Sequence, residues 1–387
     1  MSLFQEVLPG DFVERAYERA GFKFNNSVYT PLVVLWLLMW QRLQGAAPME
    51  AAVLDLLRGL PACFWPNPCK RIREWRESGK PLSGNTAAYD RARRKLPLSV
   101  VEESSDRIFD QLMTRMAPSG ASGSRRAFLV DGSTMRLACS PALAKRFPPS
   151  SNQHGESHWP VMRVLVAHDL QTGLAMRPQW GPMYGPEATS ERRLPEAAIG
   201  RLPAGATVIG DRNFGVFSVA WTATQKGNPV LLRLTVQRAE RLAGEAPRDG
   251  IDRESVWTPS KADRKSHPEP PAEACVKGRF IVCSVQPDNG DKPFSLALFT
   301  TLADPAEEVL QLYGRRWNIE TDLRTLKSQR SFAPKIASAA NEREAKREFD
   351  RMMYYLQQAK LPNRKRKRRS YPRAVWGRGE HFPTRKD

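Results

Sequence analysis

Hydrophobic residues near the start of the chain recur with the period of an α-helix. The run Leu32–Trp40 is apolar nearly all round, which predicts a buried helix. Thr30 and Pro31 precede it, and a threonine cap followed by proline is typical of a helix start. This run is the longest apolar stretch of the chain. It is shorter than the roughly 20 residues that a helix needs to span a bilayer.

Two further helices are expected after it. Residues 87–95 form a short run with a strongly basic surface, and Pro97 ends it. Ser99 and Glu102 have the spacing of a capping box, so another helix is expected from there to about residue 116. Together these patterns predict an all-helical N-terminal domain at residues 1–118.

The pattern changes after residues 118–124, which form a linker by their Pro, Gly and Ser content. Short apolar runs then predict β-strands, with a helix expected over 214–226. The expected strands are 127–130, 161–166, 206–210 and 230–234. Strands interleaved with helices predict an α/β core, and its first part is placed at 125–235.

A polar, proline-rich stretch interrupts this core. Strand-like runs at 280–285 and 294–300 follow the stretch, and we interpret residues 236–302 as a β-rich insertion. Asp304-Pro305 then opens a long helix, expected over 306–329. The last two parts of the chain are a core segment, 303–345, and a basic tail, 346–387.

The charge of the chain predicts an anionic partner. Lys and Arg number 60 against 41 Asp and Glu, for a net charge of +19. Nucleic acid is the first candidate and an anionic membrane surface is the second. The basic run at 364–369 fits a nuclear-targeting signal or a phosphate-binding tail, and we interpret it as the second. Five cysteines without a CxxC pair indicate a reducing compartment rather than a disulfide scaffold.

Three acidic residues are candidates for a metal site. Asp131 and Asp211 each follow an apolar strand directly, and Glu320 lies on the long helix. Acids at strand ends of α/β sheets face a crevice, and hard oxygen ligands suit Mg²⁺. Two such ions hold a phosphodiester, one activating the nucleophile and the other stabilising the leaving oxygen. Taken singly, each Asp also fits a turn or a helix cap, and Glu320 fits a solvated helix position.

Four residues of the long helix share one face. They are Tyr313, Arg316, Glu320 and Lys327. Their separations of three, four and seven positions place them within roughly 60° of one another, at about 100° per residue. An acid flanked by two cations fits a metal ion beside phosphate oxygens. A salt-bridge ladder along the helix is the alternative.

With this spacing the helix matches the Tyr-Arg-Glu-Lys signature of a known family. The chain resembles the DDE transposases of bacterial insertion sequences, specifically the insertion-sequence-four family. Asp131, in Val-Asp-Gly-Ser, and Asp211, in Ile-Gly-Asp-Arg-Asn-Phe, match the two aspartates of that family. Segments 29–33, 88–97 and 370–373 are also similar to parts of these transposases.

The resemblance implies a ribonuclease-H-like catalytic core with a β insertion between the second Asp and the Glu. The implied catalytic and metal-binding residues are Asp131, Asp211 and Glu320. They are expected to hold two Mg²⁺ ions, with Mn²⁺ as a possible substitute. The implied DNA contacts on the helix are Tyr313, Arg316 and Lys327.

Two further DNA contacts are expected. In hairpin-forming relatives an aromatic residue of the insertion holds a flipped base, and Trp257 is the candidate here. The alternative is that Trp257 packs in the insertion's own small core. The basic helix with Arg91, Arg93 and Arg94 is the candidate for binding element ends, although any basic surface helix has the same pattern.

The expected function is that of a DDE transposase. It binds the terminal inverted repeats of its own element, cleaves the ends by metal-dependent hydrolysis and transfers the 3′-OH strands into target DNA, by cut and paste through hairpin intermediates. The expected partners are double-stranded DNA and a second copy of the chain, with no membrane, and the expected location is the cytoplasm, on chromosomal DNA. The alternatives are a ribonuclease-H-like nuclease without strand transfer and an inactive DNA-binding relic, against which the intact acid triad argues.

Overall fold

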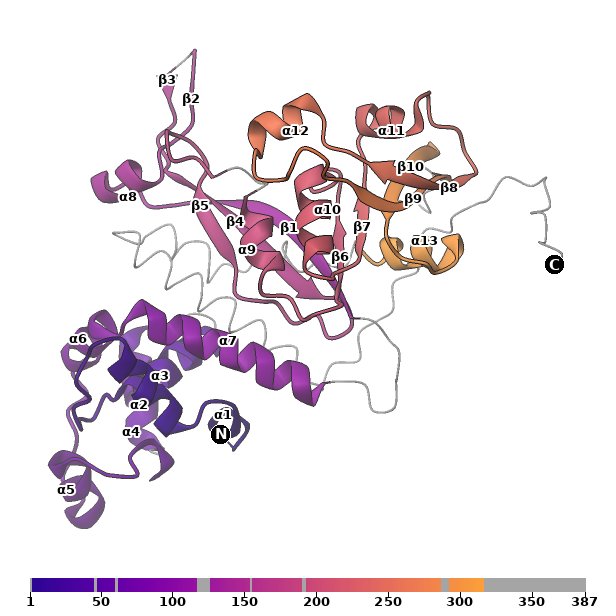
Figure 1. The fold of residues 1–387 in the computed structure, drawn as a ribbon. Coiled ribbons are helices and arrows are strands. Elements are labelled where there is room, and N and C mark those ends of the chain that lie inside the picture. The colour runs from indigo at the N-terminus through magenta and orange to yellow at the C-terminus, as the bar shows by residue number, and fades with distance from the viewer. Residues whose placement is uncertain are drawn as a thin grey trace.

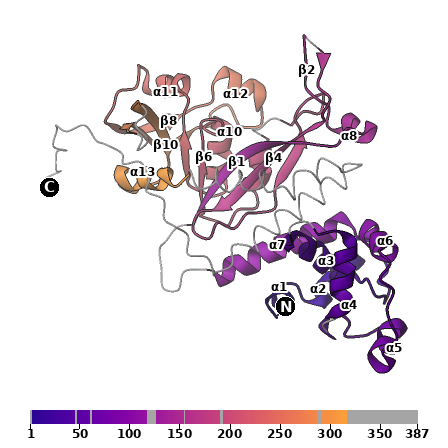
Figure 2. The same cartoon turned by 180° about the vertical axis from the view of Figure 1, so that it is seen from behind.

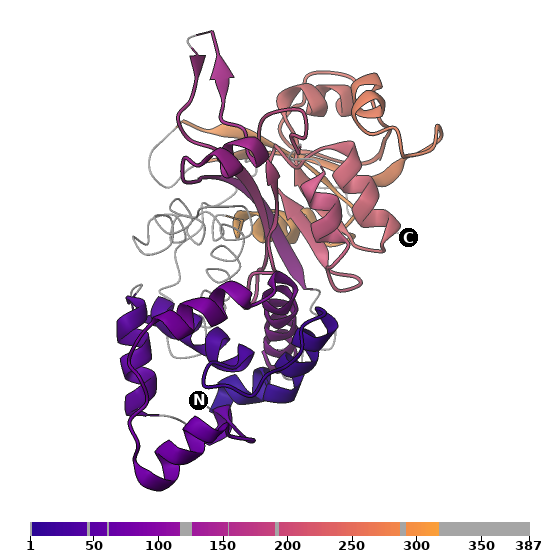
Figure 3. The same ribbon diagram turned by 90° about the vertical axis from the view of Figure 1, so that its left-hand side faces the viewer.

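The structure is a computed structural model, and it describes residues 2–44, 47–59, 62–116, 126–153, 155–189, 193–286 and 292–316. Helices gather at one end of the molecule and an α/β part forms the other (Figures 1 and 3). Glu320, Lys327 and the tail at 346–387 lie outside the described residues. No helix among the described residues is long and apolar enough to cross a membrane.

The N-terminal part consists of helices. They are α1 (Ser2–Val7), α2 (Gly10–Arg19), α3 (Pro31–Leu43), α4 (Met49–Arg58), a 3-10 turn (Ala62–Phe64), α5 (Lys70–Ser78), α6 (Ala87–Lys95) and α7 (Leu98–Arg115). The apolar helix α3 starts where the sequence predicts, and the Thr30 hydroxyl accepts the Val33 N–H at 3.3 Å. In the core of this part, the Tyr89 hydroxyl donates to Gln41 Oε1 at 2.9 Å, and both side chains are buried.

The start of α7 differs from the predicted one. The helix begins at Leu98 with Pro97 as its N-cap, and no side chain caps it. The predicted capping box of Ser99 and Glu102 is therefore wrong, because Ser99 already lies inside the first turn. Glu102 instead pairs with Arg177 of the α/β part, at 3.2 Å.

The α/β part is built on a sheet of eight strands in the order β5-β4-β1-β6-β7-β10-β9-β8. Its first five strands are β1 (Ala127–Arg136), β4 (Val161–Asp169), β5 (Gln179–Pro182), β6 (Thr207–Gly210) and β7 (Val230–Arg233). β1, β6 and β7 are parallel, whereas β4 runs antiparallel to β1 and β5 runs antiparallel to β4. A small hairpin, β2 (Ser151–Asn152) and β3 (Gly155–Glu156), protrudes from this part (Figure 1). This mixed sheet is consistent with the ribonuclease-H-like core that the resemblance implies.

The region interpreted as an insertion contains helices as well as strands. It holds α11 (Val236–Ala243), β8 (Ile251–Trp257), α12 (Lys261–Ser266), β9 (Val276–Val285) and β10 (Phe294–Thr300). Its strands do not form a separate sheet, because β10 pairs directly with β7 of the core. Figure 2 shows α11 and α12 at the same end of the molecule as β8 and β10.

Apolar side chains cover both faces of the sheet. One cluster joins Phe128 and Val208 to α7, to α9 (Leu194–Ile199) and to α10 (Phe217–Gln225). The rings of Phe109 on α7 and Phe128 on β1 lie 6.3 Å apart, so the N-terminal helices share a core with the sheet. The opposite face packs against α8 (Pro141–Arg146) and α13 (Ala306–Gly314).

Charged groups reinforce the contact of α7 with the α/β part. Asp106 of α7 accepts hydrogen bonds from Arg177 Nε, at 3.1 and 3.3 Å, and from Arg201. These three side chains are mostly buried, with 32%, 21% and 28% exposed. Their charges are therefore only weakly screened by solvent, and they fix the position of α7 on the sheet.

Candidate functional site

Asp131 and Asp211 lie side by side at the centre of the sheet. Val130 and Gly210 are aligned partners in the parallel pairing of β1 and β6, and each aspartate is the next residue of its strand or turn. Neighbouring strands lie about 4.8 Å apart, so the two backbones bring the acids together.

The position of Asp131 within its strand corrects the prediction. The sequence pattern places it at a strand end, but β1 continues to Arg136. The strand continues because β4 remains paired with it, with Asp131 opposite Val166 and Arg136 opposite Val161. Only the pairing with β6 ends at Val130, and that leaves one side of Asp131 open toward Asp211.

A tight turn orients Asp211. Its Oδ1 accepts the Asn213 N–H at 2.8 Å and the Phe214 N–H at 3.4 Å. Asp211 therefore also stabilises a turn, which was the alternative interpretation of this residue from the sequence. Gly215 closes this turn against β7, where a Cβ atom would lie 1.9 Å from the carbonyl oxygen of Arg233. Glycine is required there because the two backbones approach so closely.

The end of α13 lies on the same face of the sheet as this pair. Leu129 and Ile209 belong to the apolar cluster that contains Tyr313, and side chains two residues apart in a strand share a face. Asp131 is therefore on that face, together with Tyr313. Burial raises the pKa of Tyr313 to about 12, opposed by the nearby guanidinium groups of Arg316 and Arg233 and reinforced by the Asp211 carboxylate.

Arg233 joins the site although the sequence analysis did not select it. It ends β7, the strand next to β6, and it is half-buried near Tyr313. The available signal was an arginine directly after the apolar run Val230–Leu232, at the same edge of the sheet as the two aspartates. Its relation to Tyr313 depends on packing between β7 and α13, which no local pattern encodes.

Helix α13 is the described part of the long helix predicted over 306–329, and residues 317–329 lie outside the described residues. Helix α13 ends at Gly314, and the N–H groups of Arg315 and Arg316 bond to carbonyls three residues back. Glycine weakens a helix, and such bonds tighten its last turn. Tyr313 therefore lies in the last turn of α13, and Arg316 lies two residues beyond its end. They are still close, with the Arg316 guanidinium carbon 6.0 Å from the centre of the Tyr313 ring.

Trp257 lies in the core. Its side chain is 8% exposed and its ring packs edge-on against Phe299, at 4.9 Å, and Phe217, at 6.3 Å. This burial favours the packing alternative over the role in holding a flipped base. The packing differs from the predicted one in one respect, because Phe217 belongs to α10 of the main core rather than to the insertion.

The basic residues of α6 separate into two groups. Arg91 is exposed and lines a groove, whereas Arg94 donates from Nε to Asp90 Oδ2 at 2.9 Å. Arg93 is half-buried. Neither Arg93 nor Arg94 lines that groove.

The donor set at the centre of the sheet fits a divalent cation. Among the described ranges no group of three or more His, Cys, Asp or Glu side chains comes together, so these ranges supply only the carboxylates of Asp131 and Asp211. Mg²⁺ is usually bound through one or two carboxylates, with water and substrate phosphates completing its shell. Arg233 and Arg316 add positive charge beside the pair, which suits an anionic substrate.

One comparison with known proteins identifies a family for this chain. The profile of the family described as "Transposase DDE domain" matches residues 122–343, more than half of the chain. A search of curated proteins found no match. Among solved structures, one titled "Cryo-EM structure of piggyBac transposase synaptic complex with hairpin DNA (SNHP)" is similar at 10% identity and a TM-score of 0.41, over 92% of this chain and 74% of that chain.

Proposed function

The chain belongs to the DDE transposase family, and we propose that it cleaves the ends of an insertion sequence and joins them to target DNA. The observation that carries the proposal is the alignment of Asp131 and Asp211 within the matched domain. The assignment to the insertion-sequence-four branch rests on the Tyr-Arg-Glu-Lys spacing and is part of this proposal.

Asp131 and Asp211 are proposed to hold divalent metal, with Glu320 as the third ligand by resemblance. Bound Mg²⁺ or Mn²⁺, as two ions, would supply Lewis-acid activation of the attacking oxygen and stabilisation of the leaving one. The Gly132 N–H donates to Asp131 Oδ1 at 2.8 Å and the turn amides donate to Asp211 Oδ1, so both carboxylates are held in place. Orientation of this kind lowers the cost of assembling a reactive geometry.

Arg316 and Arg233 are proposed to bind phosphate oxygens beside the cut. A guanidinium group offers paired donors that match phosphate. Arg233 is half-buried and Arg316 is buried, so both charges lie in a setting that strengthens such an interaction. Lys327 has the same proposed role by resemblance. Tyr313 is a proposed DNA contact by resemblance; its hydroxyl is protonated and buried, so this contact requires the surrounding side chains to move.

Water is the proposed first nucleophile and the freed 3′-OH the next. The helical N-terminal part is proposed to bind the terminal inverted repeats. Transfer is proposed to follow a cut-and-paste route through hairpins, and two protein copies are proposed to pair so that both ends reach a catalytic site. The domain boundaries given above and a site of action on bacterial chromosomal DNA belong to the same proposal.

A strand-transfer assay tests the proposal. The substrate is a duplex that carries the inverted repeat found beside the gene, with Mg²⁺ and a target plasmid. Asp131→Asn and Asp211→Asn should bind this duplex normally and neither nick nor join it. Asp249→Asn is the matched control, because Asp249 also shapes a turn, accepting the Gly250 N–H at 3.0 Å and the Ser284 N–H at 2.6 Å, away from the site.

Three outcomes separate the candidates. If the natural protein nicks and joins the duplex and both Asp variants do neither, the result supports a transposase. Nicking without joining by the natural protein indicates a nuclease, and binding without nicking indicates an inactive relic. Normal nicking by Asp211→Asn would exclude the aspartate pair as the catalytic centre.

A further inference from the structure

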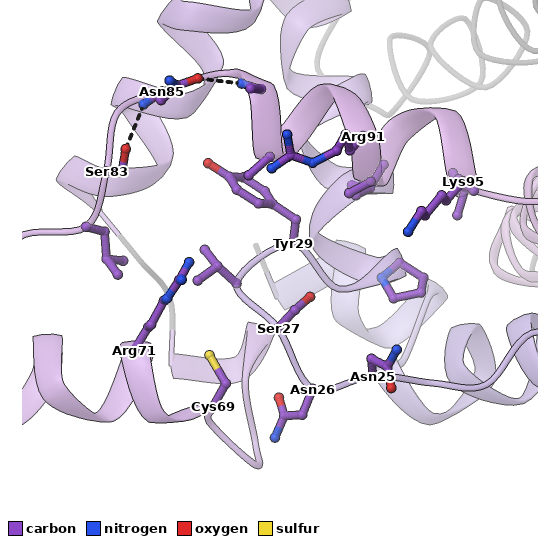
Figure 4. A pocket seen from close by; sticks show the side chains of 18 of the residues that line it. Asn25, Asn26, Ser27, Tyr29, Cys69, Arg71, Ser83, Asn85, Arg91 and Lys95 are labelled. Atoms are coloured by element: carbon purple, nitrogen blue, oxygen red, sulfur yellow. Dashed lines mark hydrogen bonds between the residues drawn. The ribbon is translucent and has the colours of Figure 1, made fainter.

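A groove of about 890 Å³ opens in the helical N-terminal part (Figure 4). Its walls come from the segment before α3, the start of α5 and the exposed side of α6. The volume lies within the range of pockets that hold small ligands or short stretches of a polymer. It is distant in sequence from the aspartate pair and plays no part in the proposed cleavage.

The charge of this groove is of one sign. Its cationic lining residues are Lys23, Lys70, Arg71, Arg91 and Lys95, and its lining contains no Asp or Glu. All five are exposed. Among these cations, Lys70 pairs with Glu74 of α5 at 3.8 Å, and Glu74 also pairs with Lys80 at 3.0 Å. A concave surface with this excess of cations attracts a polyanion.

The cations come from opposite walls. Arg71 extends from α5 and Arg91 from α6, with Tyr29 between them (Figure 4). Lys95 is one turn beyond Arg91 on the same face of α6, because residues four apart are neighbours on a helix. Phosphates that follow one another along a strand would therefore meet a cation on each side.

Polar and aromatic groups complete the lining. Asn25 and Asn26 line the groove below Tyr29 in Figure 4. The Asn26 amide donates to the carbonyl of Asn67, and the Asn25 amide has the donors that suit sugar and phosphate oxygens. Tyr29 is half-buried, and its ring is tilted against that of Tyr89 at 5.7 Å, so its orientation is fixed. An aromatic ring among cations is the usual platform for an unpaired base.

We propose that this groove binds the phosphodiester backbone of a single DNA strand, with Tyr29 as a stacking surface for one of its bases. The inference rests on the proposed function, which makes DNA the partner. This proposal changes the surface expected to bind DNA. The groove contains Arg91 together with Arg71 and Lys95, whereas Arg94 pairs with Asp90 and does not line the groove.

Fluorescence anisotropy with the full-length protein tests this assignment. The probe is a labelled single-stranded oligonucleotide of about 12 nucleotides, in EDTA so that cleavage plays no part. The double variant Arg71→Ala/Arg91→Ala should bind at least tenfold more weakly than the natural protein. Its slope of log affinity against log salt should fall by about 1.4, because each phosphate contact to a single strand contributes about 0.7.

Matched variants distinguish the groove from general charge. Arg94→Ala removes a cation of the same helix outside the groove and should change affinity less than twofold. Arg91→Lys should recover part of the loss. Tyr29→Leu should weaken binding without changing the salt slope. If Arg94→Ala and the double variant lost the same affinity for the oligonucleotide, the proposal would be overturned.

A competition experiment identifies the ligand. Inorganic phosphate at 10 mM should displace no more oligonucleotide than chloride of equal ionic strength. Full displacement by phosphate would show a site for a small anion and overturn the strand assignment. Because this assay is done in EDTA and measures binding alone, the double variant should lose affinity whether or not the natural protein cleaves element ends, so a failure of the proposed cleavage is distinguishable from a failure of the groove.

Discussion

Asp131 and Asp211 stand at the same level of the sheet, because the residues before them, Val130 and Gly210, are aligned partners in the parallel pairing of β1 and β6. The two acids are 80 positions apart in the chain. A shift of one residue in this register would turn one carboxylate toward the opposite face, since side chains alternate along a strand. The pairing of two buried strands therefore determines whether these acids can share a metal ion.

The turn that carries Asp211 depends on Gly215. Gly215→Ala should destabilise the protein by about 1–3 kcal/mol, because the added Cβ would lie 1.9 Å from the Arg233 carbonyl oxygen and must displace one backbone. DNA cleavage should fall further than stability alone predicts, since both Asp211 and Arg233 move. Gly59→Ala is the control for thermal unfolding, because nothing lies within 4 Å of a Cβ there. Equal melting temperatures for the two variants would contradict the close approach.

Trp257 should matter first for stability. Trp257→Ala should lower the free energy of unfolding by about 3–5 kcal/mol, because it leaves a cavity between Phe217 and Phe299. Trp257→Phe should recover part of that loss. Trp159→Ala is the matched control, since that side chain is 41% exposed and its removal should change stability by no more than about 0.5 kcal/mol. Normal urea unfolding of Trp257→Ala with selective loss of hairpin products would instead restore the base-holding role.

The contact of α7 with the sheet depends on Asp106. Asp106→Asn should cost about 1–2 kcal/mol, because Arg177 and Arg201 lose a shared anion in a setting that is mostly shielded from water. Asp90→Asn removes a single pair with Arg94, whose side chain is 77% exposed, and should cost less than about 0.5 kcal/mol. Thermal unfolding at low and high salt measures both. If the two variants lost the same stability, packing alone would hold α7 on the sheet.

Tyr313 should make the protein less stable in alkali. Its folded pKa of about 12 lies above the ordinary value of 10.0, so folding favours the protonated phenol. Its contribution is complete below pH 10 and is lost as the pH rises toward 12. Between pH 9 and pH 11 the natural protein should lose about 1 kcal/mol more than Tyr313→Phe in urea unfolding. Cys283, whose pKa burial also raises to about 12, is present in both proteins and cancels. Parallel pH profiles would contradict the burial of this phenol.

Local patterns in the sequence determined the main elements and the family. The apolar run of α3, the short strands around Asp131 and Asp211 and the basic character of α6 all appear in the structure at or near the predicted residues. These features follow from interactions between residues a few positions apart, such as the period of burial and the preference of threonine for a helix cap. The spacing of Tyr313 and Arg316 likewise indicated the family without any knowledge of the fold.

Tertiary structure decided the arrangement of these parts. The addition of β10 to β7, the burial of Trp257 against Phe299 and the approach of Arg233 to Tyr313 join segments that are tens of residues apart. The charged groove of the N-terminal part also requires α5 and α6 to face each other. None of these contacts has a local signal, because the free energy that selects them comes from burying apolar surface and pairing backbone groups between distant strands and helices.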